Sequence, residues 1–260
     1  MASVKEQTLS LWSNQVKPRV FIAGTGAPLV YFHGGLGLHW GEFLDSLAKD
    51  FTVYAPEFPG TTPGDQDALR ALDDWWDLVL YHYEMFDALK LPAPAVVGHG
   101  FGAMLAAEVA ATDPARARKL ALLTAMGLWR DDTPIRNFIV TPQPELASLL
   151  FMNPDHPMRA KLFPDVNDVD AVIRFKWTLA CVAKFIWPIP DKGLKKRLGR
   201  IKAPTLIVWG KQDKLIPPVY ANEFASRIKG AKVELIDDGS HMLEIENSAA
   251  VAKALTNFLK

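Results

Sequence analysis

The sequence predicts an α/β protein with a doubly wound, mostly parallel sheet of eight strands. Three observations lead to this fold class. Eight segments have the apolar patterns of strands, segments with helical patterns separate most of them, and several strand segments end in glycine. Strands that alternate with helices along a chain form parallel sheets with helices on both faces. The 260 residues are enough for one large α/β domain or two small ones.

The strand segments differ in how deeply they are expected to be buried. The first two, 8–13 (TLSLWS) and 19–24 (RVFIAG), alternate apolar and polar residues, which indicates an opening antiparallel pair. The third, 28–35 (PLVYFHGG), is a continuous apolar run, which favours a strand buried on both faces. The other strand segments are 51–60, 95–100, 119–125, 204–210 and 231–237, and the helical patterns are at 40–48, 66–90, 101–112, 216–228 and 246–259.

One interval, 129–200, has no strand pattern and is rich in proline and aromatic residues. Within it, 168–187 (DVDAVIRFKWTLACVAKFIW) has the spacing of a long apolar helix. We therefore predict a helical cap over 129–200, inserted after the sixth strand into a core domain formed by 1–128 and 201–260. Its aromatic residues are expected either to pack on the core or to line a substrate pocket. The candidates for substrate binding are Trp129, Trp177, Phe185 and Trp187.

Composition narrows the class of protein. Lys and Arg total 29, as do Asp and Glu, so nothing global attracts the chain to nucleic acid or to an anionic membrane. The single cysteine, Cys181, excludes an internal disulfide and suits a reducing compartment. The first residues lack the apolar core of a signal peptide, and no stretch is long enough to span a bilayer. We expect a cytoplasmic protein, monomer or homodimer, with a small-molecule substrate and without nucleic-acid or membrane partners.

The segment 95–105 (AVVGHGFGAML) is the first candidate for chemistry. A strand pattern ends in Gly98-His99-Gly100-Phe101-Gly102 and a helical pattern follows. This arrangement is typical of the G-x-S-x-G turn, which holds a nucleophile between a strand and a helix. Dinucleotide-binding loops are also rich in glycine, but their fingerprint is G-x-G-x-x-G in the first strand–helix unit. The spacing and mid-chain position here disfavour that interpretation.

Three further elements follow predicted strands, each at the carboxyl end. The first is a loop after the strand residues 28–32, His33-Gly34-Gly35-Leu36-Gly37, of the type that supplies a backbone N–H to an oxyanion. Asp213 lies in GKQDKLIPP after the strand 204–210, and His241 lies in DDGSHMLEIE after the strand 231–237. An isolated Asp in a turn is usually a cap and an isolated His is usually a surface residue. Their occurrence at successive strand ends favours a shared site.

With these motifs the chain resembles the α/β-hydrolase family over nearly its full length, in the branch that hydrolyses ester and C–C bonds and carries a helical cap. The resemblance implies a Ser-His-Asp type site in which Gly100 has the nucleophile position, with Asp213 as the acid and His241 as the base. It also implies oxyanion N–H groups from Gly35 and Phe101. No metal or cofactor is implied. We expect a carboxylic ester hydrolase that acts on a small, largely apolar acyl substrate, with Asp131 as the alternative acid.

Gly100 departs from the family pattern because it offers no oxygen for attack. Cys181, inside the predicted cap, is expected to be an inert thiol. Three explanations remain open. The chain is an inactive variant made to trap substrate, an enzyme that uses His241 and Asp213 for acid–base chemistry such as a lyase reaction, or a non-catalytic ligand-binding protein. Phe101 makes G-H-S-F-G the closest parent motif.

Overall fold

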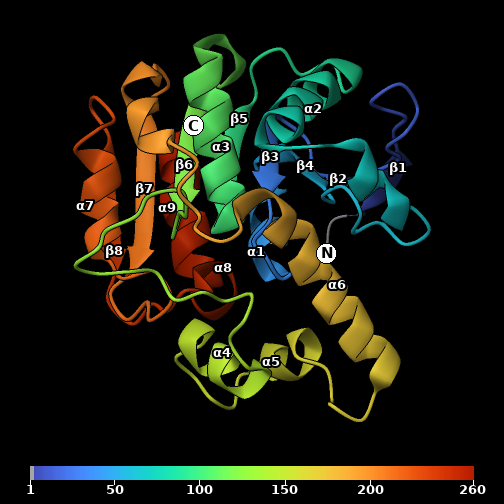
Figure 1. Cartoon of the computed structure of the whole chain (residues 1–260). Helices are drawn as coiled ribbons and strands as arrows, with labels where there is room; N and C mark the ends of the chain where they lie inside the picture. Colours follow the sequence, from blue (N-terminus) through green and yellow to red (C-terminus); the bar gives the residue numbers. More distant parts are fainter. Residues whose placement is uncertain (1–2) are drawn as a thin grey trace.

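A mixed sheet of eight strands organises the computed structural model, which describes residues 3–260 (Figure 1). The strand order is β1-β2-β4-β3-β5-β6-β7-β8. The β1–β2 and β2–β4 pairs are antiparallel, and every other pair is parallel. The predicted fold class is confirmed. The strands are β1 (Lys5–Thr8), β2 (Arg19–Ala23), β3 (Ala27–Phe32), β4 (Phe51–Pro56), β5 (Ala95–His99), β6 (Lys119–Leu123), β7 (Thr205–Gly210) and β8 (Lys232–Ile236).

The prediction for the first strand is wrong in position. The strand β1 ends at Thr8, whereas the sequence pattern predicted a strand over 8–13. Trp12, Ser13 and Asn14 all have positive φ angles, between 53° and 67°, and therefore form a tight turn rather than extended backbone. The alternation of apolar residues instead places Leu11 opposite Val16, with both side chains buried in the core.

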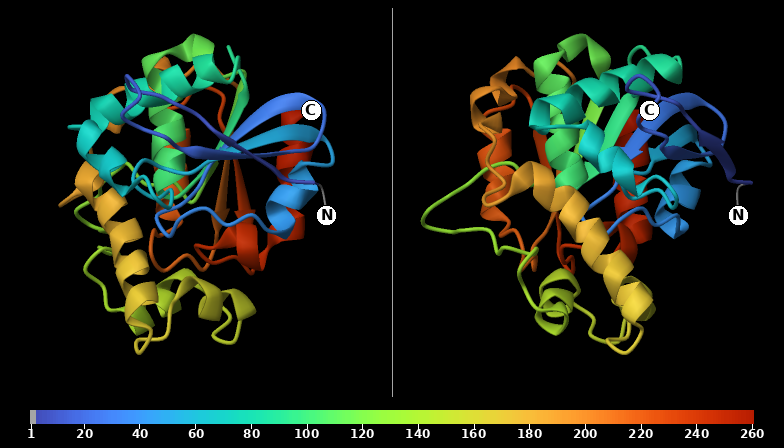
Figure 2. Two further views of the ribbon diagram at one scale, coloured as in Figure 1. Left: turned by 90° about the vertical axis from the view of Figure 1, so that its right-hand side faces the viewer. Right: turned by 45° about the vertical axis from the view of Figure 1, so that its right-hand side comes forward.

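Helices cover the two faces of the sheet and form two separate cores (Figures 1 and 2). The larger core lies under α2 (Trp75–Ala88), α3 (Phe101–Thr112) and α7 (Val219–Ala225). The smaller core lies under α1 (Glu42–Leu47) and α9 (Ser248–Leu259), next to the short α8 (Leu243–Glu246). The single helix predicted over 66–90 is two helices, because Asp74 caps the N-terminus of α2 after the short η1 (Gln66–Ala71).

The chain between β6 and β7 contains α4 (Gln143–Leu150), α5 (Pro157–Leu162) and α6 (Val169–Ile186), followed by two 3₁₀ turns, η3 (Leu194–Lys196) and η4 (Leu198–Arg200). The helices α4 and α5 lie beyond the carboxyl ends of the parallel strands (Figure 1). The segment that returns to the core is fixed to the main sheet domain by an ion pair. Arg197 forms this ion pair with Glu108, which is fully buried in α3.

Within residues 3–260, no helix has both the length and the apolar character needed to cross a membrane.

Candidate active site

A sharp turn joins β5 to α3 at Gly100. Its φ and ψ angles are 53° and −111°, a conformation that side chains rarely adopt. The two flanking glycines allow the backbones to approach closely. A Cβ atom at Gly98 would lie 2.3 Å from the carbonyl oxygen of Gly102, and one at Gly102 would lie 2.1 Å from the carbonyl oxygen of Phe32. The turn therefore packs directly between β5, α3 and β3.

His241 and Asp213 meet above this turn, as their positions at strand ends suggested. His241 Nδ1 lies 2.9 Å from Asp213 Oδ2, and both side chains are buried. The other carboxylate oxygen of Asp213 accepts hydrogen bonds from the backbone N–H groups of Leu215 and Ile216, at 2.9 and 2.8 Å. These bonds fix the carboxylate, which in turn fixes the imidazole. His241 Nε2 then faces Gly100, where a Cβ atom would lie 3.3 Å from it.

The glycine-rich loop after β3 is held by a neutral histidine. His33 Nδ1 lies 2.7 Å from the Gly34 carbonyl oxygen, which can only accept, so Nδ1 donates there. The other ring nitrogen accepts from the backbone N–H of Phe58 at 3.3 Å. Burial lowers the pKa of His33 to about 4, which keeps the ring neutral at pH 7. This loop carries Gly35 along the cavity described below, against the ring of Phe138.

Phe101, the other predicted oxyanion donor, is the first residue of α3. The first N–H groups of an α-helix have no partner inside the helix and point toward its N-terminal end. The backbone N–H of Phe101 is therefore at the same end of α3 as Gly100.

A further buried histidine, His99, lies beside the pair formed by His241 and Asp213. Its Nε2 is 2.9 Å from the carbonyl oxygen of His241, and its Nδ1 is 3.2 Å from Glu244 Oε1. Burial and the neighbouring His241 lower the pKa of His99 to about 3, whereas burial raises the pKa of Glu244 to about 8. Sequence analysis did not single out Glu244. The signal was its position three residues after His241, where the chain enters α8.

A cavity of about 590 Å³ opens over these groups. His241, His99 and Glu244 form part of its wall, together with Gly34 and Gly35 of the loop after β3. Much of the remaining wall is apolar and is formed by Leu36, Met126, Phe138, Leu150, Met158, Leu162, Leu215, Met242 and Ile245. Polar and charged side chains also line it, including His39, Glu42, Asp45, His156 and Lys161. The site thus combines one histidine–aspartate pair with a mainly apolar chamber of small-molecule size.

The four aromatic residues predicted to bind substrate lie outside the wall of this cavity. Trp129 borders a separate cavity of about 90 Å³. Trp177 donates its indole N–H to the Gly60 carbonyl oxygen at 2.7 Å, Phe185 is buried in the larger core, and Trp187 is half exposed. Trp177 and Phe185 belong to α6, which contributes no side chain to the cavity wall, whereas Trp129 and Trp187 lie outside this helix.

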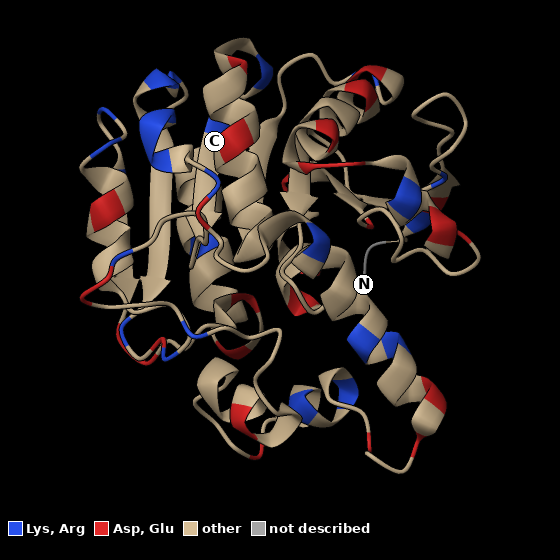
Figure 3. Ribbon diagram, in the orientation of Figure 1, with Lys and Arg blue, Asp and Glu red and all other residues tan. Residues whose placement is uncertain are grey.

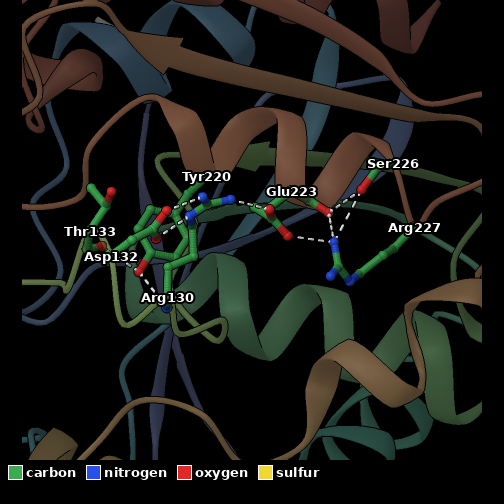
Figure 4. A network of polar contacts seen from close by, with 7 residues as sticks. All are labelled: Arg130, Asp132, Thr133, Tyr220, Glu223, Ser226 and Arg227. Atoms are coloured by element: carbon green, nitrogen blue, oxygen red, sulfur yellow. Dashed lines mark hydrogen bonds and ion pairs between the residues drawn. The ribbon is translucent and has the colours of Figure 1, made fainter.

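Asp131, the alternative acid, is on the surface and accepts a hydrogen bond from the Trp129 indole N–H at 3.0 Å. Its neighbours form an ionic network with α7 (Figure 4). Arg130 contacts Asp132 at 2.6 Å and also pairs with Glu223. Glu223 pairs in turn with Arg227 at 2.5 Å. The network fixes the chain after β6 to α7, while Asp213 contacts His241.

Cys181 behaves as the sequence suggested for a buried thiol. Burial raises the pKa of Cys181 to about 11, so little thiolate forms at pH 7.

Comparisons with known proteins agree with this fold. The chain is 26% identical over 264 residues to 2-hydroxymuconate semialdehyde hydrolase from Pseudomonas sp. strain CF600, covering 94% of this chain and 90% of that protein. It is 24% identical over 263 residues to 2-hydroxy-6-oxo-6-phenylhexa-2,4-dienoate hydrolase from Burkholderia cepacia, covering 91% and 89%. The solved structure of a hydrolase of that name from Rhodococcus sp. strain RHA1 aligns with a TM-score of 0.79 at 18% identity, covering 100% and 99%. Naproxen esterase from Bacillus subtilis aligns with a TM-score of 0.73 at 16% identity, covering 100% and 92%.

A family model matches residues 20–254, a range that includes the turn at Gly100, Asp213 and His241. With this match over most of its length, the chain belongs to the alpha/beta hydrolase family.

Proposed function

We propose that this site is built for hydrolysis of small, largely apolar esters or related acyl compounds, and that Gly100 leaves it without its nucleophile. The single observation that supports this most directly is the geometry at Gly100. A Cβ atom there would lie 3.3 Å from His241 Nε2, so a hydroxyl attached to it could reach hydrogen-bonding distance of the base.

The surrounding groups supply the other parts of such a reaction. His241 would take the proton of the attacking hydroxyl, and Asp213, 2.9 Å from Nδ1, would stabilise the imidazolium that forms. The backbone N–H groups of Phe101 and Gly35 would donate to the oxyanion of the tetrahedral intermediate. In this proposal every part except the attacking oxygen is supplied by residues already in place.

The proposed substrate class rests on the cavity and the relatives. Its wall near α4 and α5 is mainly apolar, with His156 and Lys161 as its polar members, and a volume of about 590 Å³ suits a ligand of modest size. The named relatives are hydrolases, and one aligned structure is an esterase. A mainly apolar acyl group is the part of a substrate that this chamber would bind best.

A second function has one observation in its favour. His241 lines the cavity, so its Nε2 can act as a base toward a bound molecule without any side chain at position 100. In that case the glycine form is itself the active enzyme, with chemistry that needs no covalent intermediate.

A panel of four proteins separates these proposals: the glycine form, Gly100→Ser, His241→Ala and the double variant. We expect the glycine form to show little hydrolysis of short p-nitrophenyl esters and Gly100→Ser to raise turnover strongly. Loss of a serine nucleophile from a complete site costs about 10⁶-fold. The serine variant should also be labelled by a fluorophosphonate probe, and Gly100→Ser with His241→Ala should lose both activities.

Two other outcomes contradict the proposal. If the glycine form is active and His241→Ala alone abolishes that activity, acid–base chemistry is the function. If the serine variant is folded but neither hydrolyses esters nor reacts with the probe, the site is a binding site.

A further inference from the structure

The helix α6 exposes a stripe of large apolar side chains. Val169, Ile173 and Trp177 follow one another at intervals of four residues and are 65%, 59% and 37% exposed, and Val166 just before the helix is 70% exposed. Residues four apart lie on the same side of a helix. The opposite side of α6 is buried and contains Phe175, Leu179 and Val182. The helix therefore has two apolar faces. One packs on the core, and the other is exposed to solvent.

The exposed face is accessible to a large partner. The views in Figures 1 and 2 both show α6 along the outside of the molecule, with its N-terminal half extending beside α5 and away from the sheet. A contiguous row of exposed apolar side chains on a protein surface marks a contact site more often than isolated exposed residues do. Substitution on this face leaves both cores untouched.

Charge divides α6 along its length. Asp165, Asp168 and Asp170 lie at its N-terminal end, and Arg174, Lys176 and Lys184 follow along the helix (Figure 3). Among residues 3–260, none of these six side chains forms an ion pair. Two of the six are already used within the molecule, because Lys184 Nζ donates to the Leu69 carbonyl oxygen at 2.8 Å and Asp168 caps the helix. Asp165, Asp170, Arg174 and Lys176 remain, so the helix has an acidic end and a basic part with two charges of each sign. This distribution complements a reversed copy of itself.

We propose that α6 is a self-association surface on which a second copy of this chain docks in antiparallel orientation. A two-fold axis near Ile173 would place the two apolar stripes against each other. Such an axis turns the second helix so that it runs in the opposite direction. It places each edge of one stripe beside the same edge of the other. Asp170 and Arg174 share one edge at this helical spacing, so Asp170 of each copy would lie beside Arg174 of the other.

A lipid surface fits the same observations less well. Helices that lie on anionic membranes have an excess of Lys and Arg on their polar face. The acidic end of α6, with three carboxylates, would face the headgroups at the same depth as the basic part. One helix per copy makes a small interface, so the expected dimer is weak, with a Kd on the order of micromolar.

The first test is sedimentation velocity across a range of protein concentrations. We expect a concentration-dependent dimer that Ile173→Lys weakens by at least about tenfold. The matched control is Leu80→Lys, because Leu80 on α2 is 53% exposed and lies outside the stripe. Circular dichroism of each variant verifies folding. A chain that is monomeric at all concentrations, or a dimer that Ile173→Lys leaves intact, overturns the proposal.

Two further experiments test the orientation. Asp170→Arg and Arg174→Asp should each weaken the dimer, and the double variant should recover it, because the exchange restores the complementary charges. Ile173→Cys should form a disulfide-linked dimer on mild oxidation, whereas Leu80→Cys should not, and the native Cys181 is buried. Cross-linking of both cysteine variants, or no recovery in the double variant, contradicts the antiparallel arrangement.

The membrane alternative is tested directly with vesicles of phosphatidylglycerol and phosphatidylcholine. The proposal expects no co-sedimentation of the unsubstituted chain. If a monomeric chain binds these vesicles and Ile173→Lys abolishes binding, the surface belongs to a membrane and not to a second copy.

Discussion

At the scale of single residues, Gly100 occupies the proposed nucleophile position in a backbone conformation that is strained for other residues. Its φ of 53° and ψ of −111° suit glycine, whereas a residue with a side chain is strained there. A nucleophile at this position in the proposed reaction would have to adopt the same conformation. His241 and Asp213 are held by bonds that do not involve residue 100. The base is therefore prepared whether or not a nucleophile is present.

We predict that Gly100→Ala lowers the free energy of unfolding by about 1–3 kcal/mol, the usual cost of a side chain in a disfavoured backbone conformation. Gly100→Ser should lose less than Gly100→Ala, because its hydroxyl can hydrogen-bond to His241 Nε2 and recover about 1 kcal/mol. Urea unfolding of the three proteins measures both differences. Variants as stable as the glycine form would contradict the argument from strain.

At the scale of elements, the contact between α3 and the sheet depends on glycine for space rather than for backbone conformation. Gly102 packs against β3, where a Cβ atom would lie 2.1 Å from the Phe32 carbonyl oxygen and 2.4 Å from that of His33. Both obstructing atoms belong to the backbone, which cannot rotate away as a flexible side chain can. Any larger residue must therefore push α3 away from β3 and shift the turn at Gly100.

We predict that Gly102→Ala lowers the free energy of unfolding by about 3 kcal/mol or more, as severe overpacking does. The control is Gly64→Ala. Gly64 has a φ of 86° but no atom within 4 Å of an added Cβ, so it tests backbone conformation without a clash. Its substitution should cost about 1 kcal/mol. Equal effects of the two substitutions in urea unfolding would show that space at Gly102 is unimportant.

At the scale of the whole molecule, the sequence predicts those features that follow from the periodicity of apolar residues and from the order of strands and helices along the chain. Alternation of strands and helices predicted the parallel sheet, and the convergence of strand ends predicted that Asp213 and His241 lie together. The turn at 12–14 was not predictable, because two of its three positive φ angles occur in Trp12 and Ser13, which rarely adopt them, and only Asn14 favours such angles. The cavity wall was not predictable either. Its aromatic side chains are those of Tyr31, Trp40, Phe43 and Phe138, and no residue of α6 belongs to the wall. The aromatic pattern of α6 therefore carried no information about the wall.

The whole molecule also buries an unusual set of titratable groups. His33, His82 and His99 are all buried, and burial lowers their pKa values to about 4, about 4 and about 3. Glu244 shifts in the opposite direction, because burial raises its pKa to about 8. All four groups are therefore held neutral near pH 7 in the folded state. The free energy of unfolding should therefore decrease both when the pH falls below neutral and when it rises above neutral.

Each histidine has a folded pKa below its unfolded value of 6.5, so the unfolded state binds the proton first as the pH falls. Their stabilisation is present above pH 6.5 and is lost as the pH falls toward the folded pKa values. Glu244 has a folded pKa above its unfolded value of 4.5, so its stabilisation is present below pH 4.5 and is lost as the pH rises through about 8. Stability should therefore be greatest close to neutral pH.

Between pH 6 and pH 5, the three histidines bind protons in the unfolded state only, whereas Glu244 holds a proton in the folded state only. The unfolded state should therefore bind about two more protons than the folded state. We predict that the free energy of unfolding falls by about 2–3 kcal/mol per pH unit there, at about 1.4 kcal/mol for each proton. His82→Gln removes one of these protons while keeping a donor for the Leu78 carbonyl oxygen that His82 Nδ1 contacts at 2.7 Å. Urea unfolding at several pH values should therefore show a slope that is smaller by about 1.4 kcal/mol per pH unit in this variant. Parallel curves for the two proteins would mean that His82 is not held neutral in the fold.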